Sequence, residues 1–257
     1  MPGGPEAVDW QGQPLDCEAC RFRGHLARRQ CGPGWSCAFD RYAPRIVRFF
    51  TMNPEAADLC LDAPGPETRA HAARVANVFR LRPLLDDPDP GVRAVAVLRL
   101  PATQARAALK DPDREVRLAL AWRLPFSDLV PLLNDADPQV RLIVARRVDP
   151  GVLPILLRDP DPEIRRLVAQ RIGLRWLDQM LADADPLVRR VVALRLIPDR
   201  LRVFVTDPDI RVRHAVAERA EAELARHLLA DPDAPVREAA AVRLAELAAE
   251  RETDVDR

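Results

Sequence analysis

Apolar and polar positions recur along most of the chain with a period of 24 residues. Each period opens with Asp, then Pro or Ala, then Asp, and three and four residues later come a β-branched residue and Arg. Seven consecutive copies of this pattern, with no residue inserted between them, predict a solenoid, in which every repeat buries its apolar face against its neighbours. The residues 63–86 form a degenerate copy that keeps Arg69 but lacks the aspartates. The seven clear copies, residues 87–254, begin at Asp87, Asp111, Asp135, Asp159, Asp183, Asp207 and Asp231.

Each repeat is expected to contain two helical segments. We number its positions from the first aspartate, which is position 0. The aspartate at position 2 is suited to cap a helix N-terminus, and several copies place Pro directly after it, as at Pro90. This helix should end near position 13, before a breaker such as Pro101 or Gly173. A second apolar cluster, for example Leu129 and Leu132, predicts a short α-helix or 3-10 helix.

Arginine recurs in two columns, at positions 6 and 12 of every full repeat, for example Arg93 and Arg99. Both positions fall inside the apolar arc of the helix, so their guanidinium groups require carboxylate or carbonyl partners. We expect a ladder in which the two arginine columns pair with the aspartates at positions 0 and 2 of the same or the adjacent repeat. The alternative, a stripe that binds nucleic acid, would need arginines on the free face that no acid neutralises.

The free face of the first helix, positions 7 and 11, is apolar in the early repeats. Ala94, Leu98, Leu118 and Trp122 occupy it, whereas later repeats carry polar residues there. An exposed apolar patch marks a surface that something covers. Two interpretations are open: packing against the N-terminal segment or another repeat, and a site for a protein partner.

The composition excludes several classes of function. The chain has 257 residues, with 39 basic and 39 acidic side chains, which argues against a general polyanion binder. No phosphate-binding glycine loop or nucleophile elbow is visible, and the histidines lie far apart, so we expect no catalytic site, no enzyme activity and no small-molecule substrate. No apolar run is long enough to span a bilayer and no signal peptide is evident, which predicts a cytoplasmic protein without a membrane partner.

Residues 1–62 do not repeat and contain four clustered cysteines, Cys17, Cys20, Cys31 and Cys37. Thiols at this spacing can hold either a tetrahedral zinc ion or an iron–sulfur cluster, and spacing alone leaves the choice open. The glycines of the loop between Cys31 and Cys37 could turn N–H groups toward sulfur, and its Trp35 could exclude water. Four arginines between the second and third cysteines could offset the charge of a thiolate-ligated cluster, or could form a solvated helix face: Arg21, Arg23, Arg28 and Arg29.

A fifth cysteine, Cys60, stands apart from this group. We interpret it as a small buried core residue, with a role as substitute ligand only if Cys37 lies too far from the others.

Together the 24-residue repeats and the four cysteines resemble the leucine-rich repeat variant family. The resemblance covers nearly the whole chain and implies a right-handed, all-helical solenoid of alternating α- and 3-10 helices. It also implies a small N-terminal domain, residues 1–62, followed by the solenoid at 63–257. By this resemblance Cys17, Cys20, Cys31 and Cys37 are ligands of a four-iron, four-sulfur cluster, with zinc as the alternative metal.

The resemblance implies neither a reaction nor a partner, so three functions are compared. The first is a redox- or oxygen-responsive adaptor without a catalytic site, whose solenoid surface binds a protein partner. The second is an accessory protein of electron transfer. The third is a nucleic-acid-binding solenoid, which the balanced charge disfavours.

Overall fold

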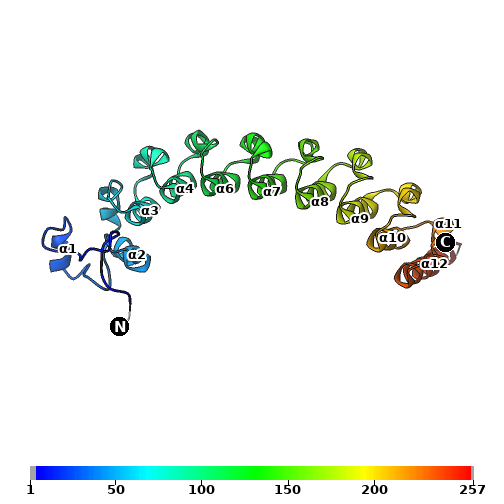
Figure 1. Ribbon diagram of the computed structural model, residues 1–257, viewed down its shortest axis with the longest axis horizontal. Coiled ribbons are helices and arrows are strands. Elements are labelled where there is room, and N and C mark those ends of the chain that lie inside the picture. The colour runs from blue at the N-terminus through cyan, green and yellow to red at the C-terminus, as the bar shows by residue number, and fades with distance from the viewer. Residues whose placement is uncertain (1–3, 256–257) are drawn as a thin grey trace. The chain divides into compact units, whose positions relative to one another are not determined.

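The repeats fold as alternating α-helices and short helices. The computed structural model describes residues 4–255, with side chains up to residue 250, and the chain divides into two compact units, 1–132 and 133–257. Within each unit the longer α-helices form one layer and the short helices a second layer (Figure 1). The described residues contain no β-strand, only isolated bridges between Val8 and Pro14 and between Gly32 and Ser36. The expected all-α fold class is therefore confirmed.

The first unit begins with the helices around the cysteines and continues through the degenerate repeat and the first two clear repeats. Its elements are α1 (Arg23–Ala27), α2 (Ala43–Met52), η1 (Pro54–Leu59), α3 (Pro66–Val75), η2 (Val78–Arg80), η3 (Arg82–Asp86), α4 (Pro90–Arg99), α5 (Ala102–Ala105), η4 (Arg106–Ala108), α6 (Arg114–Arg123) and η5 (Phe126–Asp128). The helix η6 (Val130–Asn134) contains the division between the units. The domain boundary expected at residue 62 stays a prediction.

The second unit contains the remaining repeats. Its elements are α7 (Pro138–Arg147), η7 (Leu153–Leu156), α8 (Pro162–Arg171), η8 (Leu174–Met180), α9 (Pro186–Arg195), η9 (Pro198–Phe204), α10 (Ile210–Ala217), α11 (Ala222–Leu228) and α12 (Ala234–Val255). The second segment of a repeat is a 3-10 helix in most copies, and α11 shows that it can also be α-helical. Both forms were allowed by the sequence.

The last repeat departs from the two-segment prediction because α12 runs without interruption from Ala234 to Val255. In earlier repeats the residue at position 13, such as Leu100, turns into the extended conformation and is fully buried, and Pro101 follows it. The equivalent stretch of the last repeat is Leu244 and Ala245, which favour a helix, so the chain meets no breaker there.

The core follows the predicted apolar positions. Val92, Ala96 and Leu100 are all 0% exposed, as are their counterparts Ile164 and Val168 in the second unit. The aspartate at position 2 caps the first helix: the carboxylate of Asp89 accepts a hydrogen bond from the N–H of Val92 at 3.2 Å. The capping role predicted for this column is therefore confirmed.

The arginines at position 6 form the expected ladder between adjacent repeats. The Nε and Nη2 atoms of Arg141 donate to the two carboxylate oxygens of Asp159 at 2.7 and 2.9 Å. Its remaining Nη1 donates to the backbone carbonyl of Asp135 at 2.8 Å. The aspartate that starts a repeat is thus clamped by the arginine of the repeat before it. The same pairing joins Arg69 to Asp87, Arg93 to Asp111, Arg165 to Asp183, Arg189 to Asp207 and Arg213 to Asp231.

The prediction that the arginines at position 12 also pair with aspartates is wrong. Arg219 donates to the carbonyls of Ala193 and Leu196, at 2.8 and 2.7 Å, at the C-terminal end of α9. Arg99 contacts the carbonyls of Ala73 and Ala76 at the end of α3 in the same way. The last carbonyls of a helix have no partner within that helix, and a guanidinium from the next repeat satisfies them.

The apolar free face of the early repeats is not covered in the described structure. Leu98 is 49% exposed and Trp122 is 61% exposed. The interpretation that the N-terminal segment or another repeat covers Leu98 and Trp122 is therefore wrong, whereas Ala94 and Leu118 on the same face are half-buried. Within the described residues, no helix combines the length and apolar character that crossing a membrane would require.

Candidate metal centre

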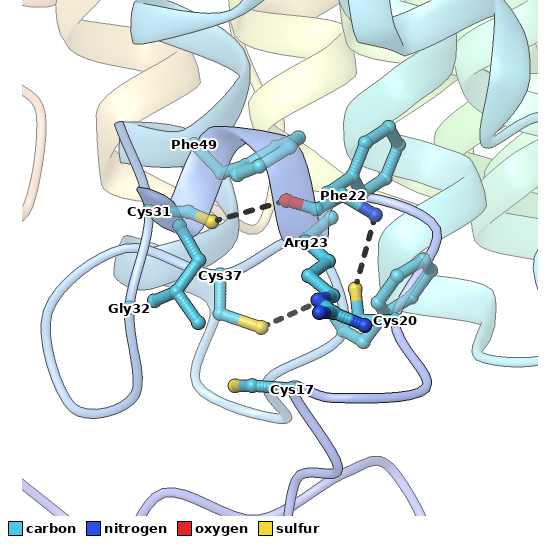
Figure 2. Close-up of a pocket in the computed structure, with 11 residues that line it drawn as sticks. Cys17, Cys20, Phe22, Arg23, Cys31, Gly32, Cys37 and Phe49 are labelled. Carbon is cyan, nitrogen blue, oxygen red and sulfur yellow. Dashed lines mark hydrogen bonds between the residues drawn. The ribbon is translucent and has the colours of Figure 1, made fainter. Parts of the chain in front are cut away.

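The four clustered cysteines line one pocket of the first unit. Its empty space, the open mouth included, measures about 300 Å³. The thiol side chains of Cys17, Cys20, Cys31 and Cys37 surround this space (Figure 2). The structure thus brings together all four residues that the sequence selected, although they come from segments up to twenty residues apart.

Apolar side chains form the inner wall of the pocket. Phe22 and Phe49 are 3% and 1% exposed, and their ring centroids lie 5.0 Å apart. Phe22 also stacks on Phe39 at 5.7 Å. These rings hold the cysteine-bearing loops together and keep water from one side of the thiols, which lowers the local dielectric constant. The remaining lining residues are Arg23, Leu26, Gly32 and Ala38.

Backbone N–H groups donate to two of the sulfur atoms. The N–H of Phe22 lies 3.4 Å from Cys20 Sγ, and the N–H of Phe39 lies 3.4 Å from Cys37 Sγ. In both cases the donor is two residues after the cysteine. Hydrogen bonds to sulfur stabilise thiolate ligands and are among the levers that tune iron–sulfur clusters. The sequence carries a signal for these donors, Cys-x-Phe in two copies, which the spacing of the cysteines alone does not reveal.

The loop between Cys31 and Cys37 has a different role from the one expected. Gly32 N–H donates to Ser36 O at 2.7 Å, so this glycine closes the turn and gives no hydrogen bond to sulfur. A Cβ atom at Gly32 would come within 2.5 Å of Trp35 Nε1. Gly34 adopts a φ of +80°. Trp35, at 36% exposure, thus packs over the backbone of a pocket-lining residue without lining the pocket itself.

Burial and neighbouring cysteines raise the pKa values of Cys17, Cys31 and Cys37. Burial raises the pKa of Cys37 to about 12, although the hydrogen bond from Phe39 N–H acts in the opposite direction. The pKa values of Cys17 and Cys31 are also raised, first by burial and then by neighbouring cysteines. Bringing four thiolates together therefore requires compensating positive charge, which bound metal ions supply.

Cys60 is fully buried and does not line the pocket, which confirms its interpretation as a core residue. Burial raises the pKa of its thiol to about 12. Because Cys37 does line the pocket, no substitute ligand is needed.

The thiols surround a space and do not converge on one point. In the described part of the chain, no three His, Cys, Asp or Glu side chains lie close enough together to hold a single metal ion. A zinc ion binds thiolates at about 2.3 Å, so its four sulfurs would lie roughly 4 Å apart. A cluster of several metal and sulfide atoms needs a wider ring of thiols. The donor set, the N–H donors to sulfur and the apolar wall therefore fit an iron–sulfur cluster.

These features define a class of protein, an α-helical solenoid with a thiol-lined module at its N-terminal side. Comparison with known families agrees with both parts of this description. Residues 7–59 match the family model described as "LRV protein FeS4 cluster", and residues 138–161 match the model described as "Leucine rich repeat variant". The solved structure described as a leucine-rich repeat variant with a novel repetitive protein structural motif is 42% identical, with a TM-score of 0.82, over 90% of this chain and 99% of that chain. The chain belongs to the leucine-rich repeat variant family.

A curated relative gives no further information on role. It is described as an uncharacterized 27.7 kDa protein in the nifB 3′ region of Rhodobacter capsulatus, and it is 60% identical over 85 residues. The match spans 33% of this chain and about a third, 35%, of that relative's length.

Proposed function

We propose that the protein holds a four-iron, four-sulfur cluster through Cys17, Cys20, Cys31 and Cys37. The observation that carries this proposal is the arrangement of all four thiols around one pocket with N–H donors to two of the sulfurs. When bound, the cluster supplies one-electron chemistry. The chain's own residues hold it, shield one side with the rings of Phe22 and Phe49, and leave the other side open.

The protein acts as a redox- or oxygen-responsive adaptor without a catalytic site. Its solenoid binds a protein partner, and the state of the cluster controls that binding. Exposed large apolar side chains on the repeats support a partner surface: Phe79, Phe126 and Trp122 are 88%, 62% and 61% exposed. Repeat stacking offers extended surfaces of this kind. A cytoplasmic location suits free thiols, which stay reduced there.

A second candidate is an accessory protein of electron transfer. It is favoured by the open side of the pocket, where Cys17 is only partly buried. The two functions differ in what reduction does, because the adaptor changes its affinity for the partner whereas the carrier passes the electron on.

Metal and sulfide analysis after anaerobic purification tests the cofactor. We expect iron and acid-labile sulfide in near-equal amounts in the unaltered protein, and their loss in C17S, C20S, C31S and C37S. The matched control is C60S, which removes a thiol that does not line the pocket and should retain iron and sulfide. Stoichiometric zinc without sulfide would contradict the cluster and leave a purely structural module.

The same preparations test the function. Partner capture that differs between the oxidised and reduced protein, and that C31S abolishes, is the expected result for an adaptor. Capture that survives complete loss of the cluster would exclude coupling. A cluster that can be reduced and reoxidised without decomposition, with no change in partner capture, would favour electron transfer instead.

A further inference from the structure

One cationic side chain lines the thiol pocket. Among the described residues around the pocket, Arg23 is the only Lys or Arg. It begins α1, three residues after Cys20, and Figure 2 shows its side chain directed into the space that the thiols of Cys20 and Cys37 also face. Its nearest carboxylate is that of Glu18, with 3.7 Å between Nε and Oε2. Glu18 lies between Cys17 and Cys20, so both members of this pair are close to the thiols.

The other arginines of this segment are directed elsewhere. Arg21 donates from Nη1 to the carbonyl of Leu59 at 2.5 Å and lies 3.7 Å from Asp62. Arg28 donates from Nε to Gln30 Oε1 at 2.9 Å. Neither of them lines the pocket. The sequence offered four candidates for charge compensation, and the structure selects one.

We propose that Arg23 sets the reduction potential of the cluster by stabilising its reduced form, and that Glu18 weakens this effect by competing for the guanidinium. The inference rests on the proposed function, since it requires a cluster at the four thiols.

The change in charge on reduction gives the direction in which Arg23 shifts the potential. One electron from an external donor enters the cluster, no bond is broken, and the negative charge held by the cluster and its thiolates increases by one unit. A nearby cation interacts more favourably with the reduced form than with the oxidised form, so it raises the potential. The apolar wall of Phe22 and Phe49 reduces dielectric screening on one side. The side chain of Arg23 is 70% exposed, so solvent weakens the effect without removing it.

The test is a reductive titration of the full-length, cluster-loaded protein with dithionite, followed by the spectrum of the reduced cluster. In R23Q we expect the equilibrium constant for reduction to fall about tenfold, which for a one-electron couple is a potential about 59 mV more negative. R23K keeps the positive charge and should remain close to the unaltered protein. R28Q is the matched control, because it removes a charge of the same segment that does not line the pocket.

Glu18 gives an independent second variant. E18Q removes the competing carboxylate and should raise the potential. If R23Q does not retain its cluster, the proposal is tested with E18Q. The proposal is overturned if R23Q and R28Q shift the potential equally, or if R23K shifts it as far as R23Q, or if E18Q leaves it unchanged. Absence of iron and sulfide from the unaltered protein would overturn the proposed function as well, and is measured before any potential.

Discussion

Arg141 and Asp159 show how one residue pair joins two repeats. Their side chains are 9% and 2% exposed, and each of the three guanidinium nitrogens donates to an acceptor in the same or the next repeat. The carboxylate of Asp159 also accepts from the N–H of Asp161 at 2.9 Å. Lysine could not replace arginine here, because a single ammonium group cannot bind two carboxylate oxygens and a carbonyl in one plane. This explains why the buried position-6 column consists of arginine and contains no lysine.

Removing one member of the pair leaves the other buried without its partner. We expect D159A to lower the free energy of unfolding by about 3–5 kcal/mol. The control is D178A, which breaks the exposed pair between Asp178 and Arg200, whose side chains are both 46% exposed, and should cost less than about 1 kcal/mol. Urea unfolding followed by circular dichroism measures both variants. Equal effects would contradict a structural role for the ladder.

At the scale of the element, the helices depend on their neighbours for capping. The aspartate at position 2 satisfies the N-terminus of its own helix, as Asp161 does for α8 through Glu163 N–H at 2.8 Å. The C-terminus is satisfied from outside, by the position-12 arginine of the following repeat. The helices here are about ten residues long, too short to be stable alone, so this contact contributes to the stacking of one repeat on the next.

Arg219 provides the clearest test of this external cap. R219M keeps much of the apolar stem but leaves the carbonyls of Ala193 and Leu196 without their donor, and we expect a loss of about 1.5–3 kcal/mol in the free energy of unfolding. R226M, in the exposed part of α11, should change stability by less than about 0.5 kcal/mol. A thermal unfolding series compares the two. A neutral R219M would show that water replaces the guanidinium at no cost.

For the whole molecule, zero net charge is the sum of charges arranged within and between repeats. The position-6 arginines pair with aspartates, and the position-12 arginines hold backbone carbonyls, with the position-2 aspartates acting as helix caps. The columns are therefore engaged inside the fold and do not form a stripe for phosphate groups.

The ladder also predicts how stability depends on pH. Burial alone would raise the pKa of Asp183, but the hydrogen bonds from Arg165 and from Asp185 N–H outweigh it, and the pKa is lowered below 3.8. Asp111 and Asp231 are shifted in the same direction. A carboxylate with a lowered pKa in the folded state stabilises the fold at any pH above its unfolded value, and this contribution is lost as the pH falls through the folded value.

We therefore expect the free energy of unfolding to be level near neutral pH and to decrease progressively from just above pH 4 downward. Urea titrations between pH 2 and pH 7 measure this. D183A, which removes one of the ladder carboxylates with a lowered pKa, should show a shallower decrease than D178A. An identical pH profile for the two variants would contradict the assignment of acid sensitivity to the ladder.

Much of this protein is determined locally. The 24-residue period, the N-cap at position 2 and the apolar positions follow from short-range rules, because each repeat meets only its neighbours and repeats the same solution. The four-cysteine set lies outside the repeats, and its close spacing along the chain makes it recognisable in the sequence. Only the tertiary structure decided which groups a side chain contacts in the next repeat or across a loop. It directed the arginines at position 12 to carbonyls, it exposed Trp122, and it placed Arg23 at the thiols while Arg21 and Arg28 turn elsewhere. Residues of the same type and spacing receive different roles because a long, flexible side chain binds whichever acceptor the packed backbone brings within its reach.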